Sequence, residues 1–256
     1  MNSDAPEQIP NHPPATTEPV VIRGISNEEF LLRFARPGCV GLSAGPTLVD
    51  RVIARAERHV DPEGRPGRWS HSFLFQGVRL DGHHWVIESD LQFNRKHIRL
   101  GVQENRLAKY YDASTYGTLA VLDFGLKEQQ VSALLREALD LVAARVRYSL
   151  RELVGTYLAF HRPELRGKEN VLSRDASLFC SAFVQHLFRR IELDLAPGLD
   201  VKHTTPEDLS RTAVPHMTYL LEPAPEPRGP VARRLRRLKA RLRHAKMAVT
   251  KKKGPQ

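Results

Sequence analysis

The sequence predicts an α+β domain, and three observations support this fold class. Residues 65–93 contain two runs rich in β-branched and aromatic residues on either side of Asp81-Gly82, which is typical of a β-hairpin. Residues 127–147 repeat apolar side chains at helical spacing, and residues 177–191 form a mostly apolar stretch of helical length. Because strands and helices follow one another without a regular strand-helix alternation, we expect an antiparallel sheet packed against helices.

The remaining elements are predicted from shorter patterns. Residues 46–60 and 150–160 are predicted to be helical, and short strands are expected at 98–102, 118–124 and 217–221. Thr205 is predicted to cap a helix that begins at Pro206, because proline is favoured at the first helical position and acidic residues follow it in the first turn.

Composition divides the chain into four parts. Residues 1–20 are rich in proline and are expected to be disordered, and residues 21–222 form the folded domain. Residues 223–230 form a proline-rich linker, and residues 231–256 form a basic amphipathic tail.

The charge is concentrated in this tail. The net charge is +10, but twelve Lys and Arg residues and no acidic residue follow position 227, so the first 227 residues carry about −2. The tail, Arg228–Lys253, is therefore expected to bind an anionic membrane surface or nucleic acid, although a solvated terminal helix packed on its own domain remains the alternative.

Neither a membrane-spanning helix nor a secretory signal is expected, because no long uncharged apolar run occurs and the first 20 residues lack a basic and apolar leader pattern. Two cysteines fit a reducing compartment, so the expected location is the cytoplasm, with peripheral attachment to a membrane. No cofactor is expected. No metal site is expected either, since the histidines lack metal-ligand spacing and no cysteine cluster accompanies them.

Cys180 is the first candidate for chemistry. It lies near the beginning of the apolar helical stretch, where unpaired N–H groups and the helix dipole favour a thiolate. The alternative is a buried cysteine that serves only as a small apolar side chain. Cys39 is a weaker candidate nucleophile, because it lies in an expected strand.

His71 is the natural base for such a thiol. If Asp81-Gly82 is a two-residue turn, His71 lies opposite Gln92 and shares a hairpin face with His84, Glu88 and Asp90. One of these side chains would orient the imidazole ring, unless this face is polar only because it meets solvent.

The segment Phe179–Val184, FCSAFV, resembles the nucleophile helix of the NlpC/P60 papain-like cysteine hydrolases. His71 precedes Cys180, as in the circularly permuted branch, which includes the YiiX/YaeF-like amidases and the lecithin:retinol acyltransferase group. Shorter resemblances to YiiX-like proteins occur in the same order at residues 36–42, 70–73, 85–89, 147–149 and 205–209.

This resemblance implies a permuted papain-like fold and a catalytic triad of Cys180, His71 and Glu88, with Asp90 and His84 as alternative third residues. Tyr148 and Ser181 are expected to support the oxyanion or the site. The implied activity is hydrolysis or acyl transfer at an amide or ester bond through a thioester, on a cell-wall peptide or a lipid-type substrate. The competing hypothesis is a catalytically inactive binding module that attaches through its basic tail; the oligomeric state is not predicted.

Overall fold

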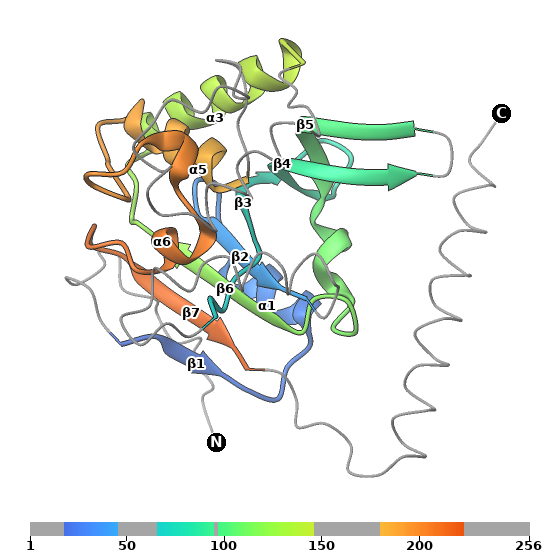
Figure 1. Ribbon diagram of the computed structural model, residues 1–256. Coiled ribbons are helices and arrows are strands. Elements are labelled where there is room, and N and C mark those ends of the chain that lie inside the picture. The colour runs from blue at the N-terminus through green and yellow to red at the C-terminus, as the bar shows by residue number, and fades with distance from the viewer. Residues whose placement is uncertain (1–17, 46–65, 95–96, 146–179, 223–256) are drawn as a thin grey trace, which may run out of the picture. The chain divides into compact units, whose positions relative to one another are not determined.

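The computed structural model describes residues 18–45, 66–94, 97–145 and 180–222. It is a mixed α+β structure, as the sequence predicts, with one seven-stranded sheet and helices on both faces (Figure 1). The predicted helices at 46–60 and 150–160, the linker and the basic tail lie outside the described residues.

The sheet has the strand order β1-β7-β6-β2-β3-β4-β5. The strands are β1 (Val20–Ile22), β2 (Val40–Ala44), β3 (His71–Val78), β4 (His84–Asn94), β5 (His97–Arg106), β6 (Thr118–Asp123) and β7 (Met217–Leu221). Only β1 pairs in parallel, with β7, and all other neighbours are antiparallel. The predicted strands near 98–102, 118–124 and 217–221 are confirmed, although β5 is longer than expected.

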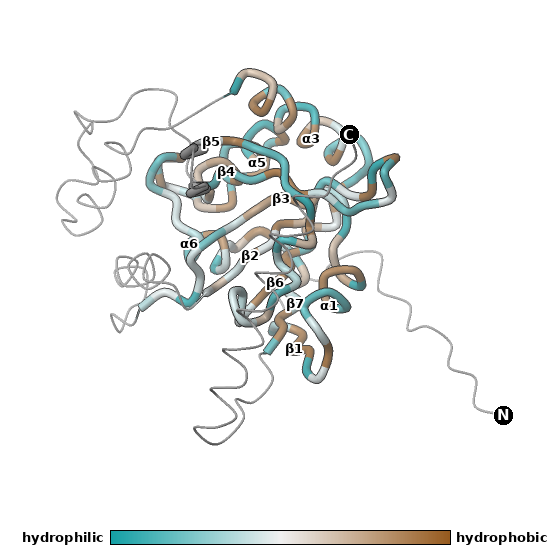
Figure 2. The backbone as a smooth tube through the Cα atoms, turned by 90° about the vertical axis from the view of Figure 1, so that its right-hand side faces the viewer, coloured by the Kyte–Doolittle hydropathy of each residue, from teal (hydrophilic) through white to brown (hydrophobic). Residues whose placement is uncertain are grey.

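The helices are α1 (Asn27–Phe34), α3 (Glu128–Ala143), α5 (Cys180–Arg189) and α6 (Pro206–Ser210), with short 3-10 helices η2 (Leu107–Tyr111) and η4 (Val201–His203). The predicted cap of α6 is confirmed, since the Thr205 side chain accepts from the Asp208 N–H and the Asp208 carboxylate accepts from the Thr205 N–H. The helix predicted to reach residue 147 ends at Ala143, and Arg145 has a positive φ of 52°. In Figure 2, α3 shows hydrophobic and hydrophilic colours alternating along its turns.

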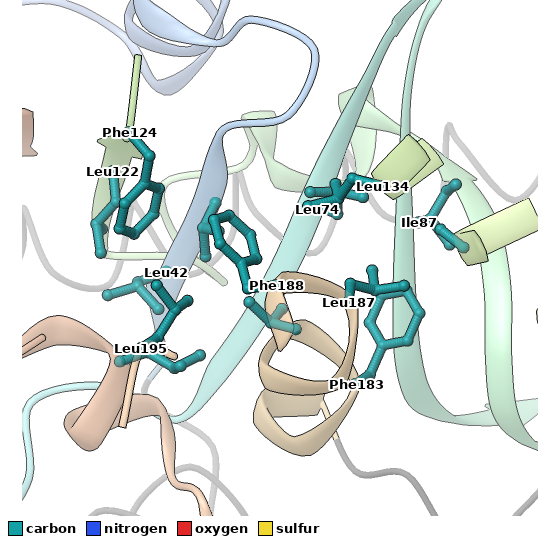
Figure 3. Close-up of a cluster of buried hydrophobic side chains, with 14 of the residues drawn as sticks. Leu42, Leu74, Ile87, Leu122, Phe124, Leu134, Phe183, Leu187, Phe188 and Leu195 are labelled. Carbon is teal, nitrogen blue, oxygen red and sulfur yellow. The ribbon is translucent and has the colours of Figure 1, made fainter. Parts of the chain in front are cut away.

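The sheet separates two apolar clusters, because neighbouring residues of each strand point to opposite faces. Leu42, Leu74 and Ile87 belong to the cluster that includes residues of α3 and α5, and Figure 3 shows Phe183, Leu187 and Phe188 of α5 among these strand residues. On the other face, Phe73, Phe75 and Val86 pack with side chains of α1 and η2. Both faces of the central strands are therefore buried, and α5 is held firmly against β3.

The turn between β3 and β4 differs from the predicted two-residue turn. Gly82 N–H donates to the Arg79 carbonyl and Arg79 N–H donates to the His83 carbonyl, so Leu80, Asp81 and Gly82 form a three-residue loop. Gly82 has a φ of +72°, the left-handed conformation that this loop type requires at its last position. The loop shifts the strand pairing by one residue relative to the prediction.

A second shift occurs inside the hairpin. The register changes between Phe75 and Gly77, so that Leu74 pairs with Ile87 instead of Ser89. The predicted position of Gln92 opposite His71 is therefore wrong by two residues. Because side chains alternate with a period of two, the combined shift of two residues keeps the side chains beyond the irregularity on their predicted faces while it moves Glu88 and Asp90 toward His71.

Candidate functional site

Cys180 is the first residue of α5, and the packing of this helix holds it beside the start of β3. Phe183 and Leu187 are fully buried and anchor the helix on the sheet. The hydroxyl of Ser181 donates to the Thr204 carbonyl at 2.6 Å and ties the first turn of the helix to the loop before α6. The thiol is partly buried.

His71 is the first residue of β3 and lies between Cys180 and Glu88. Its Nε2 atom is 2.6 Å from Oε2 of Glu88. The imidazole also forms a side-chain hydrogen bond with the Cys180 thiol. Because Nε2 contacts Glu88, this hydrogen bond uses Nδ1. The structure thus brings these three residues together, although His71 and Cys180 are far apart in the sequence.

Glu88 is completely buried in β4 and accepts hydrogen bonds from four side chains. Its Oε2 accepts from His71 and from the Tyr110 hydroxyl, which is 2.5 Å away. Its Oε1 accepts from the Asn105 amide and the Lys109 ammonium, each at 2.7 Å. Lys109 also donates to Asp90 at 2.6 Å. A buried carboxylate with this set of donors is fully satisfied and fixed in orientation.

These contacts change the pKa values of the three groups. Burial opposes ionisation of Glu88, but Lys109 and His71 outweigh it and hold the pKa of the carboxyl well below its usual range. Burial also disfavours the imidazolium, yet Cys180 and Glu88 raise the pKa of His71 to about 10. The Cys180 thiol is likewise buried, but His71 and then Ser72 lower its pKa. The arrangement favours a thiolate beside an imidazolium at neutral pH.

A stack of aromatic rings packs against one side of the His71 imidazole. The rings of Phe73 and Tyr110 are stacked with centroids 4.0 Å apart, and Tyr110 is also stacked with His71 at 6.5 Å. Phe73 lies against Gly41 of β2, where a Cβ atom would overlap the ring. Because Gly41 has no side chain, it leaves space for the Phe73 ring, and the stacking of Phe73 on Tyr110 positions the Tyr110 hydroxyl at Glu88.

The other predicted site residues lie as follows. Lys109 donates to both Asp90 and Glu88, so it links the two carboxylates. The carboxylate that contacts the His71 ring nitrogen is that of Glu88 and not that of Asp90. His84 pairs with Val78, which lies at the other end of β3, seven residues and roughly 23 Å from His71. The structure therefore contradicts His84 as an alternative third residue. Tyr148 lies outside the described residues. Cys39 is buried just before β2, and burial beside Asp123 raises the pKa of its thiol.

Sequence reasoning missed Asn105, Lys109, Tyr110 and Ser72. Asn105 could have been found from the pairing of β5, because Gln103 lies opposite Glu88 and Asn105 is its diagonal neighbour on the same face. Lys109 and Tyr110 reach Glu88 from η2, a short helix that has no periodic sequence pattern. Only the folded structure brings η2 under the hairpin.

Among the described residues, every helix is too short or too polar to span a membrane. No group of three or more His, Cys, Asp or Glu side chains in the same ranges is arranged to hold a metal ion.

Comparison with known proteins gives one kind of similarity. No protein-family model matches the chain, and no curated protein matches it in sequence. Among solved structures, the crystal structure of the metalloprotein yiiX from Escherichia coli is similar with a TM-score of 0.41 and 13% identity, over 72% of this chain and 88% of that one. The resemblance to YiiX-like proteins and the assignment to the permuted papain-like superfamily stay predictions.

Proposed function

We propose that the protein is a cysteine hydrolase or acyltransferase that acts on an amide or ester bond through a thioester on Cys180. The observation that carries this proposal is the buried chain of contacts from Glu88 through His71 to the thiol. A nucleophile, a base and a group that orients the base are the three parts that thiol acyl transfer needs.

In the proposed mechanism, the thiol proton passes to Nδ1 of His71 and the thiolate attacks the substrate carbonyl carbon. The C–S bond forms as the carbonyl π electrons move to oxygen, and main-chain N–H groups at the start of α5 would donate to the resulting oxyanion. The imidazolium then returns its proton to the leaving amine or alcohol as the C–N or C–O bond breaks. Water or an acceptor hydroxyl or amine, deprotonated by His71, releases the acyl group and restores the thiol.

Glu88 would hold the imidazole in one tautomer throughout this cycle. Because Nε2 faces the carboxylate, its N–H stays directed at Glu88 and Nδ1 remains the nitrogen that exchanges the proton with sulfur. The substrate classes that we propose are a cell-wall peptide and a lipid-type acyl compound.

A thiol-reactivity experiment tests the proposal. Iodoacetamide labelling of the native protein should have an apparent pKa well below the ordinary thiol value of about 8.5. The variants Cys180→Ser and His71→Ala should lose this fast reaction, while Cys39→Ser should keep it. Incubation with p-nitrophenyl esters should then add one acyl mass to Cys180, detectable by mass spectrometry. An ordinary thiol pKa, unaffected by His71→Ala, would reject the enzyme and favour the inactive binding module.

A further inference from the structure

Ser72 lies between His71 and Phe73 in β3 and faces α5, the helix that begins at Cys180. Side chains alternate along a strand, so Ser72 and Leu74 point to the face opposite that of Phe73. Leu74 belongs to the apolar cluster that contains Phe183 and Leu187 of α5. Ser72, which is fully buried, therefore lies on the side of the sheet from which Cys180 approaches.

The strand pairing leaves the main chain of Ser72 available to the thiol. The paired residues of β3 and β4 end at Leu74 and Ile87, before Ser72 is reached. Since Phe75 N–H donates toward β2, to the Cys39 carbonyl, the alternate N–H groups of Leu74 and Ser72 point toward the β4 side. Beyond the end of the paired region, the Ser72 N–H donates to the Cys180 sulfur.

The hydroxyl of Ser72 is the unexplained group. Its oxygen is one of three buried side-chain polar atoms, among the described residues, that have no hydrogen-bond partner of regular geometry. A buried hydroxyl without a partner weakens the fold unless it serves another purpose. The Ser72 hydroxyl and the Ser72 N–H group both lower the pKa of the Cys180 thiol, so both favour the thiolate.

We propose that the Ser72 hydroxyl is a further catalytic group that turns its O–H toward the Cys180 sulfur and stabilises the thiolate. This inference rests on the proposed function and extends it. The O–H bond remains intact, because the hydroxyl only donates a hydrogen bond. His71 keeps the transferred proton, while the N–H and O–H of Ser72 hold the sulfur from a second side. As the sulfur becomes a thioester, the hydroxyl loses its charged acceptor.

The variant Ser72→Ala removes the oxygen without adding volume, and Ser70→Ala is its matched control. The Ser70 hydroxyl is also buried and near His71 in sequence, but it donates to the Ser43 carbonyl. The apparent pKa of Cys180, measured from iodoacetamide rates across pH and from thiolate ultraviolet absorbance, should rise by about one unit in Ser72→Ala, as expected for loss of a hydrogen bond to a charged group. Ser70→Ala should leave it unchanged.

Each outcome has a separate meaning. A low thiol pKa that stays the same in Ser72→Ala overturns the role of Ser72 but leaves the proposed function intact. An ordinary pKa in the natural protein that rises further in Ser72→Ala supports the Ser72 contact and rejects the proposed function. Urea unfolding of Ser72→Ala at a pH below the thiol pKa, where no thiolate accepts from the hydroxyl, should show unchanged or increased stability because an unpartnered hydroxyl is removed. Equal shifts of the thiol pKa in both serine variants would overturn the proposal.

Discussion

The Nε2 atom of His71 lies 2.6 Å from Oε2 of Glu88, and the carboxylate at this contact has no exposure to solvent. A buried carboxylate that is ionised must be balanced by cations and donors, and here Lys109, His71, Asn105 and Tyr110 provide them. The electrostatic state of the imidazole therefore depends on residues that never reach the thiol.

The first prediction concerns Glu88→Gln. Loss of the carboxylate charge should lower the pKa of His71 and slow Cys180 alkylation at pH 6 by at least about tenfold, equivalent to one pKa unit. It should also destabilise the fold by about 3 kcal/mol, because Lys109 loses one of its two carboxylate partners. Rates with iodoacetamide and urea unfolding measure the two effects.

The pH dependence of this stability difference has a definite sign. The pKa of Glu88 is lower in the folded than in the unfolded protein, so its contribution is present above about pH 4.3 and is lost as pH falls through the folded value. Glu104→Gln is the matched control, since Glu104 pairs with Arg79 at a partly exposed site of the same sheet and should cost under about 1 kcal/mol. Equal behaviour of the two variants would contradict the special role of Glu88.

The second prediction concerns Lys109→Met. Without the ammonium group, His71 becomes the main cation beside Glu88 and should keep its proton to a pH above its present value of about 10. Ring-nitrogen NMR shifts of His71 should show this rise, and turnover should fall because the imidazolium becomes a poorer proton donor. Lys109→Arg should restore most of the natural behaviour; a fall in the His71 pKa would show instead that Glu88 had taken up a proton.

The third prediction distinguishes the two thiols by pH. Burial raises the pKa of Cys39, while His71 lowers that of Cys180 against the effect of burial. At pH 7 the native protein should therefore react quickly at one thiol, and the second should become available only on unfolding. Peptide mapping after brief labelling identifies the site. Fast labelling of Cys39 in the native protein would be inconsistent with its 3% exposure.

The sequence was sufficient to predict the hairpin, the start of α6 and strand β7, because each has a local signal: turn residues, a capping pattern or a short apolar and aromatic run. It was not sufficient to predict the pairing of Glu88, since the three-residue loop and the irregularity near Gln76 each move the register by one residue. α1 was not predicted, although Ser26 accepts from the Glu29 N–H at its start, because the helix has only eight residues. The contacts of Lys109 and Tyr110 are tertiary, and no local pattern indicates them.

The fourth prediction tests the aromatic support of the site. Gly41→Ala would place a Cβ atom inside the space of the Phe73 ring and should destabilise the fold by about 3 kcal/mol, in the upper range for overpacking. The displaced ring would also disturb Tyr110, so the Cys180 pKa should rise in the same variant. Gly117→Ala is the control, because its nearest neighbour to an added Cβ is 3.9 Å away. The double variant Gly41→Ala with Phe73→Leu should recover part of the stability.

The fifth prediction separates the basic tail from the site. The Glu222 N–H donates to the Ile22 carbonyl and its carboxylate pairs with Arg23, so a chain that ends after Glu222 retains the described contacts of β7. This truncation should preserve thiol reactivity and unfolding cooperativity. It should abolish flotation with anionic vesicles at low salt, because each basic residue near an anionic bilayer contributes roughly 1 kcal/mol.

The full chain supplies the comparison for this truncation. Its vesicle attachment should weaken steeply as salt rises and should be absent from zwitterionic vesicles, as expected for an interaction dominated by twelve basic residues without a compensating acid. Filter binding to DNA or RNA under the same conditions distinguishes nucleic acid from membrane as the partner. If the truncated protein instead unfolds, or loses the low pKa of Cys180, the tail is part of the domain that builds the site and not a separate attachment segment.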